Sequence, residues 1–102
     1  MITFHSFIPE GSRDTIQSWI DKLEIELLVV NPRKTKLGDF KVYQGKLSIS
    51  VNSNLNPYSF LITLTHELAH AFVFKKYNNS VLPHGLQWKA TFKAMLLNFI
   101  HL

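Results

Sequence analysis

The sequence predicts an α+β protein in which a small sheet follows an N-terminal helix and precedes two further helices. Apolar residues recur with helical spacing near both ends of the chain, while residues 40–51 alternate between apolar and polar side chains. Because helices and strands occupy separate stretches, the order is that of an α+β fold. At 102 residues, 46% of them hydrophobic, one domain spanning residues 1–102 with a modest core is expected.

The first helix is expected over residues 12–24. Ile16, Ile20 and Leu23 lie at i, i+4 and i+7, which predicts one buried face. Ser12 precedes this stretch and is a candidate N-cap, because a serine hydroxyl is able to accept a hydrogen bond from a free backbone N–H.

The middle of the chain predicts about three strands in an antiparallel-type sheet. Residues 25–30 form a β-rich run that ends at Asn31-Pro32. Residues 40–43 and 46–51 alternate around Gln44-Gly45, which is typical of a hairpin. If the strand over residues 46–51 lies at the sheet edge, an extended peptide is able to add to it as a further strand.

Two helices should complete the chain. Asn56-Pro57 should begin the first, since Asn caps a helix and Pro fits its first turn. This helix should run to about Tyr77 and end at Asn78-Asn79. A loop through Pro83 then leads to a last helix over about residues 85–100, whose apolar face consists of Trp88, Phe92, Met95, Leu96 and Phe99.

The composition narrows the classes of function. The chain has no cysteine, which excludes disulfides and cysteine zinc ligands and suits a reducing compartment. No stretch has the pattern of a signal peptide or a membrane span, so a cytoplasmic protein without membrane contact is expected. The net charge of +4 permits an acidic partner such as nucleic acid but does not require one.

Residues 66–70 read His-Glu-Leu-Ala-His within a predicted helix. His66 and His70 are four residues apart, so they lie on one face where both imidazoles are able to bind the same zinc ion. Glu67 lies beside them, in reach of a water on the metal, as a general base must be. It is the only charged residue in residues 60–74, and a carboxylate in so apolar a helix needs a partner. The alternative is two core or capping histidines beside a surface glutamate.

A catalytic zinc needs a third protein ligand and an open position. His84 is the best candidate, because the loop over residues 78–83 allows the chain to turn back over the helix and Gly85 allows a close backbone approach. The alternative is a capping or surface histidine, and surface positions are expected for His5 and His101. Three ligands with a base favour catalysis over a closed structural site, which usually has four protein ligands.

These residues predict a zinc ion that lowers the pKa of its bound water and polarises a scissile carbonyl. Glu67 would take the proton and deliver it to the leaving amine. Tyr77, Tyr43 and Gln87 are candidate donors to the oxyanion. Asp39 is a candidate to orient a ligand imidazole, although a solvated turn position is the simpler expectation.

Basic residues form groups that are candidate contacts for DNA phosphates, in an interaction that is salt-sensitive and independent of base sequence. Trp88 or Tyr43 would be able to stack on an unpaired base, although a core position is favoured for Trp88. Solvated helix and turn faces are the alternative for the charges. The groups are Arg33, Lys34 and Lys36 in one turn, Lys75 and Lys76 at the end of the zinc helix, and Lys89 and Lys93 on the last helix.

The chain resembles the SprT-like zinc metallopeptidases, which include the Spartan proteases. The likeness rests on residues 65–71 around the His-Glu-Leu-Ala-His motif, on Pro83-His84-Gly85 and on Trp88-Lys89-Ala90-Thr91-Phe92 within the last helix. Lys36-Leu37-Gly38 is also similar to the basic-Gly entry to a strand in this family, and residues 51–57 are similar to its Asn-rich approach to the zinc helix. In all, the likeness covers roughly residues 33–96.

The resemblance implies a minimal zincin-like fold and peptidase activity, with His66, His70 and His84 as ligands of one zinc ion and Glu67 as the base. For the Spartan branch it implies cleavage of proteins crosslinked to DNA, with DNA as activator. Many members continue into a cysteine-containing zinc ribbon, which is not expected within residues 1–102. The alternatives are a zinc-stabilised module that binds DNA or protein without proteolysis, and a zinc hydrolase acting on a non-peptide substrate.

Overall fold

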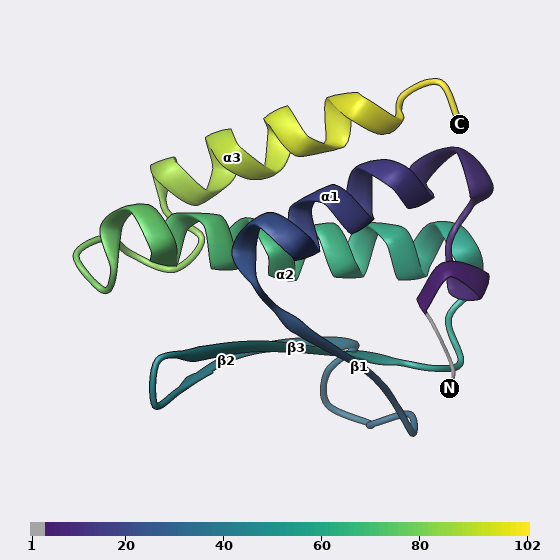
Figure 1. Cartoon of the computed structure of the whole chain (residues 1–102), viewed down its shortest axis with the longest axis horizontal. Coiled ribbons are helices and arrows are strands. Elements are labelled where there is room, and N and C mark those ends of the chain that lie inside the picture. Colours follow the sequence, from purple (N-terminus) through teal and green to yellow (C-terminus); the bar gives the residue numbers. More distant parts are fainter. Residues whose placement is uncertain (1–3) are drawn as a thin grey trace.

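The computed structural model describes residues 4–102 and has the predicted α+β architecture, with helices packed over a small sheet (Figure 1). Met1–Thr3, with which the predicted domain begins, lie outside the described residues. Within residues 4–102 no helix combines the length and apolar character that crossing a membrane requires. The helices are α1 (Arg13–Leu23), α2 (Pro57–Tyr77) and α3 (Leu86–Leu96), and the strands are β1 (Glu26–Val30), β2 (Gly38–Tyr43) and β3 (Lys46–Asn52).

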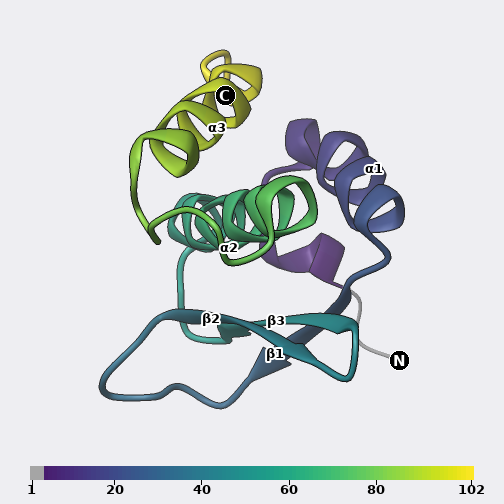
Figure 2. The ribbon, with the colours of Figure 1, turned by 90° about the vertical axis from the view of Figure 1, so that its left-hand side faces the viewer.

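Helix α2 lies at the centre, with the sheet on one side and α1 and α3 on the other (Figure 2). Its start is the predicted one, because the Asn56 side chain accepts a hydrogen bond of 2.9 Å from the backbone N–H of Ser59. It ends at Tyr77, and Asn78 follows with a φ of 54° while its N–H bonds back to the Phe74 carbonyl. Since both sides of α2 are covered, it is apolar almost all round.

The sheet is mixed, which corrects the predicted antiparallel type. β2 and β3 form the predicted hairpin, and Gln44 and Gly45 have φ values of 50° and 77°, as a two-residue turn of this kind requires. β1, however, pairs in parallel with β3, and the strand order is β1-β3-β2. Residues 31–37 carry the chain past the position of β3 to β2. The hairpin then returns the chain into the centre in the same direction as β1.

β3 is therefore the central strand, and the predicted peptide-binding edge at residues 46–51 is wrong. Its backbone groups pair with β1 on one side and with β2 on the other, so no ladder remains for a substrate. Leu47, Ile49 and Val51 alternate inward and are at most 4% exposed. The edges of this sheet are β1 and β2.

Helix α1 lies within one residue of its predicted ends, whereas the last helix does not reach its predicted end. Ser12 occupies the N-cap position of α1 as predicted, but its hydroxyl donates to the Pro9 carbonyl at 2.6 Å and makes no capping hydrogen bond. The last helix is shorter than expected, since α3 ends at Leu96 and Leu97–Phe99 forms a 3₁₀ turn. The predicted face of α1 belongs to the core, as do Trp88, Met95 and Phe99 of the C-terminal segment, whereas Phe92 and Leu96 of the same predicted face are only partly buried.

Candidate metal centre

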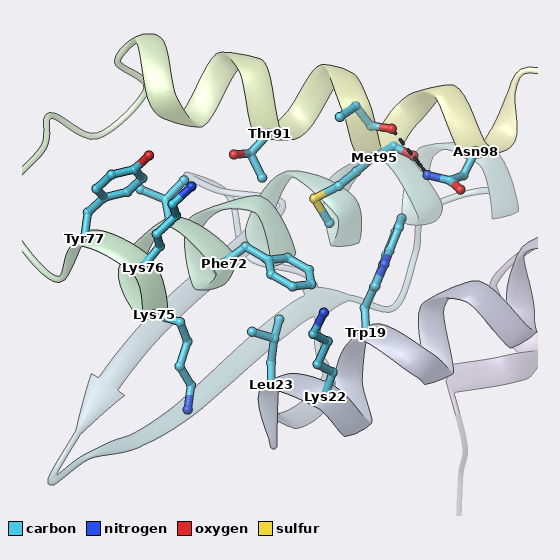
Figure 3. Close-up of a pocket in the computed structure, with 12 residues that line it drawn as sticks. Trp19, Lys22, Leu23, Phe72, Lys75, Lys76, Tyr77, Thr91, Met95 and Asn98 are labelled. Carbon is cyan, nitrogen blue, oxygen red and sulfur yellow. Dashed lines mark hydrogen bonds between the residues drawn. The ribbon is translucent and has the colours of Figure 1, made fainter.

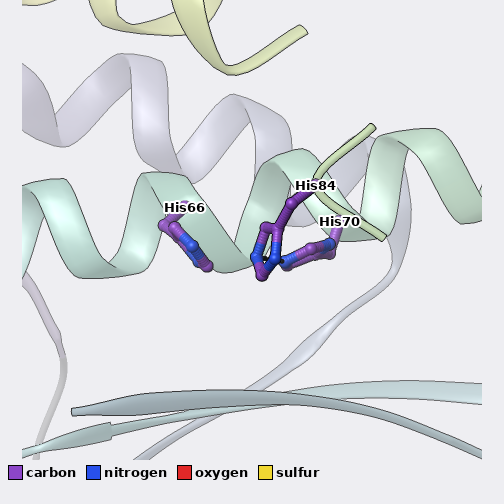
Figure 4. A group of neighbouring side chains, drawn as sticks. All are labelled: His66, His70 and His84. Carbon is purple, nitrogen blue, oxygen red and sulfur yellow. Dashed lines mark hydrogen bonds between the residues drawn. The ribbon is translucent and has the colours of Figure 1, made fainter. Parts of the chain in front are cut away.

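Three histidines converge on the side of α2 that faces the sheet (Figure 4). One ring nitrogen from each of His66, His70 and His84 lies within 4.8 Å of the others. The Nε2 atoms of His70 and His84 are 3.0 Å apart. The predicted spacing on α2 brings the first two together, and the loop after α2 brings His84 to them. Three imidazole nitrogens at this spacing are a donor set that is able to bind a metal ion.

A tight turn holds His84 in place. The Gly85 N–H donates to the Leu82 carbonyl at 3.0 Å, and His84 has a left-handed φ of 58°. A Cβ at Gly85 would lie only 3.0 Å from the Leu82 oxygen, so a side chain there would strain the turn. A non-glycine residue with positive φ costs about 1–3 kcal/mol and tends to occur at functional sites. The turn therefore holds His84 in a strained backbone conformation, and in this conformation its imidazole points at α2 (Figure 4).

The imidazoles on α2 favour their neutral forms. Burial lowers the pKa of His66 below its usual value. Burial, together with the neighbouring imidazoles of His66 and His84, lowers the pKa of His70 to about 4. A neutral imidazole keeps the nitrogen lone pair that a metal requires. The electrostatics of the site thus suit the donor set.

Trp88 forms one wall of the centre, a role that the sequence did not indicate. Its ring lies 4.6 Å from that of His84 and stacks on His70 at 5.2 Å between centroids. Its indole N–H donates to the His66 carbonyl at 3.3 Å, and Phe92 stacks behind it. At 8% exposure Trp88 is buried, as favoured from the sequence, and has no free face for a nucleic-acid base. Its position four residues after His84 was the available signal.

Glu67 is buried beside the histidines, with 8% of its surface exposed. Its Oε2 lies 3.1 Å from His66 Nδ1. Burial first, and then the charge of Asp39, raise the pKa of Glu67 to about 7, even though His84, Arg33 and Lys36 partly offset the rise. Because both shifts disfavour the charged forms, the contact with His66 is closer to a hydrogen bond than to a full ion pair. A carboxyl group whose pKa lies near neutrality is suited to accept and release a proton.

The start of β2 closes over Glu67 because residue 38 is a glycine. A Cβ at Gly38 would lie 2.8 Å from Thr63 Cγ2 and 3.3 Å from Glu67 Oε2. The strand therefore approaches α2 more closely than a side chain would allow. This approach contributes to the burial that shifts the pKa of Glu67.

Two cavities meet at Glu67. One, of about 340 Å³, extends toward the loop after α2, and the other, of about 300 Å³, extends toward the N-terminal half of α2. His70 and His84 line the first cavity, and His66 lines the second. The first cavity is lined by residues that include Asp39, Phe40, His70, Phe74, Asn78, Asn79 and His84, and the second by Leu37, Gly38, Ile62, Thr63 and His66.

Other predicted site residues lie apart from the imidazoles. Asp39 lines the first cavity, but its carboxylate pairs with Lys36 at 3.4 Å and with Lys41 at 3.8 Å. It acts on Glu67 through its charge rather than by a contact with a histidine. Tyr77 lines a groove on the other side of α2, and Tyr43 is 73% exposed in the hairpin. Asn78 and Asn79, which follow the end of α2 as expected, also line the first cavity.

The candidate phosphate contacts divide into two kinds. Arg33 is committed to the fold, because its guanidinium donates to the Asn52 side chain at 2.9 Å and to the Ser50 hydroxyl at 2.8 Å. It ties the connection before β2 to β3. Lys36 pairs with Asp39, whereas Lys34, Lys89 and Lys93 are exposed and make no ion pair within residues 4–102.

Comparison with known proteins places these features in one family. The model of the SprT-like family matches residues 15–98. No curated protein matches the chain. The matched segment contains the sheet, α2 with His66, Glu67 and His70, the His84 turn and α3. Because the match covers most of its length, the chain belongs to the SprT-like family.

Proposed function

We propose that this protein is a zinc-dependent metallopeptidase. The observation that carries the proposal is the convergence of three imidazoles beside a buried carboxyl group that lines two cavities. A closed structural zinc site usually has four protein ligands, so a set of three supports a position left for substrate or water. Membership of the SprT-like family supports the same activity.

The chemistry follows from the donor set and from Glu67. His66, His70 and His84 would hold the zinc, which when bound supplies Lewis acidity to a water molecule and to a carbonyl group. Glu67, with its pKa raised to about 7, accepts a proton from water and returns it to the leaving amine. Trp88 keeps these imidazoles in orientation by stacking on His70 and packing edge-on against His84.

The substrate in this proposal is an extended peptide that pairs with β2. This strand bonds to β3 on one side only, and its residues Asp39 and Phe40 line the first cavity beside Glu67. Edge strands bind extended peptides through their free backbone groups. β2 thus takes the role that the sequence assigned to residues 46–51.

Proteins attached to DNA are the proposed substrates in the cell. Support comes from the family likeness to the Spartan proteases and from the exposed Lys34, Lys89 and Lys93. These lysines would contact phosphates without reading bases. A zinc-stabilised module that binds DNA or protein without cleaving it is the competing proposal.

The deciding experiment measures zinc content and cleavage together. Free and DNA-bound protein substrates are incubated with wild type, with Glu67→Gln and with the surface control Glu26→Gln, each with and without single-stranded DNA. Glu67→Gln should retain zinc but lose about 10²- to 10⁴-fold in cleavage rate, the usual contribution of a general base. Glu26→Gln should match wild type. If zinc-loaded wild type cleaves no faster than Glu67→Gln on every substrate, the peptidase proposal is wrong and the binding module stands.

A further inference from the structure

A groove on the helical side of the molecule is separate in position and character from the histidines. α1 and α3 each pack mainly on α2, side by side on its far side from the sheet (Figure 2). A cavity of about 730 Å³ is lined by residues of these three helices and by Asn98 (Figure 3). The histidines point the other way, toward the sheet (Figure 4). The proposed peptidase chemistry does not use this groove.

The floor and inner walls of the groove are apolar. Trp19 of α1, Phe72 of α2 and Met95 of α3 line it, and Figure 3 shows these three side chains converging from different helices. The Trp19 ring packs edge-on against Phe72 at 6.4 Å, yet both rings remain partly exposed. The α3 wall also contains small side chains, Thr91 and Ala94, which leave room for a close approach. A concave apolar surface of this kind favours burial by a partner.

The charges at the groove are all positive. Lys22 of α1 and Lys75 and Lys76 of α2 line it, and no aspartate or glutamate does. None of the three lysines forms an ion pair with any residue of the described chain, 4–102. Lys76 lies over the Tyr77 ring at 5.3 Å, which leaves its charge uncompensated. Electrostatic complementarity therefore selects an acidic partner.

Because helices line the groove, a helical partner fits it better than an extended one. Every lining residue from Trp19 to Asn98 belongs to a helix or to a helical turn, so no strand edge offers backbone hydrogen bonds. An extended peptide would leave its own N–H and C=O groups unpaired on this apolar floor, whereas a helix satisfies them internally. Helices bind grooves of this kind through apolar side chains at i, i+3, i+4 and i+7.

We propose that this groove binds an acidic amphipathic helix of a partner protein. The apolar face of that helix packs on Trp19, Phe72 and Met95, and its acidic residues pair with the lysines at the groove. Binding there would bring a partner to the peptidase without occupying the cavities beside Glu67.

A selection experiment tests the proposal. A displayed library of amphipathic helical peptides of about 15 residues, long enough to hold a helix, carries random acidic, neutral or basic flanks. Selected peptides should be acidic, and binding should shift the indole N–H resonance of Trp19 but not that of Trp88. The triple variant Lys22→Glu, Lys75→Glu, Lys76→Glu should bind them roughly tenfold or more weakly. The surface control Lys46→Glu, outside the groove, should stay within about twofold of wild type.

Three outcomes would overturn the proposal. The selected peptides could carry no acidic excess, or they could bind the triple variant as tightly as wild type while its thermal unfolding is unchanged. Alternatively, oligothymidylate or phosphatidylserine vesicles could shift the Trp19 resonance with the same dependence on the lysines while no acidic peptide does. In that case the groove would serve nucleic acid or a membrane surface.

Discussion

The two sides of α2 differ in how their ionisable groups are exposed to solvent. Toward the sheet, Glu67, His66 and His70 are wholly or partly buried. Burial raises the pKa of Glu67 and lowers those of His66 and His70, so it favours the uncharged form of each. Toward α1 and α3, the charged groups are exposed lysines around an apolar groove. One side suits the proposed proton transfer and metal binding, and the other suits the proposed association with a partner. The difference comes from what covers each side. Strand β2 and the Trp88 ring lie close over Glu67 and the histidines, whereas α1 and α3 leave a groove between them on the other side.

The largest effect expected in this comparison is loss of metal on replacing His84. His84→Ala removes one of three imidazoles, and zinc affinity should fall by more than about 100-fold, beyond the usual cost of losing a supporting contact. Competition with a chromophoric chelator measures this, and the exposed His101→Ala is the control. If zinc affinity is unchanged in His84→Ala, His84 is not a zinc ligand.

A tryptophan on each side of α2 allows a direct comparison. Trp88→Phe keeps an aromatic wall but removes the N–H that donates to the His66 carbonyl, and zinc affinity should fall about tenfold, as for other supporting contacts. Trp19→Phe, on the groove side, should leave zinc affinity within about twofold of wild type. Equal losses in the two variants would mean that general destabilisation, rather than support of the imidazoles, explains the effect.

The third effect, on stability rather than on zinc affinity, concerns the glycine over Glu67. Gly38→Ala places a methyl group against Thr63 and Glu67, and the free energy of unfolding should fall by about 1–3 kcal/mol, as in other overpacked sites. Chemical denaturation measures this change. Gly45→Asn is the control, because its position is open and asparagine tolerates its φ of 77°, so a change within about 0.5 kcal/mol is expected. If Gly38→Ala is as stable as wild type, the close approach of β2 does not depend on glycine.

Much of the fold was accessible from the sequence because its signals are local. Asn56 and Pro57 set the start of α2, Gln44-Gly45 set the hairpin, and apolar spacing set the buried face of α1. The four-residue spacing of His66 and His70 likewise placed them on one face of a helix. Ser12 marked the start of α1, but the expected capping hydrogen bond is not formed, because its hydroxyl donates to the Pro9 carbonyl.

The sequence by itself determined the helices, the hairpin and the neighbouring positions of His66, Glu67 and His70, because caps, turns and periodicity act within a few residues. Only the tertiary structure decided that β3 is central, that Trp88 packs against the histidines and that Gly38 lies over Glu67. Each depends on which distant segments pack together. The pKa of Glu67 belongs to this second group, because burial and the charge of Asp39 on β2 raise it.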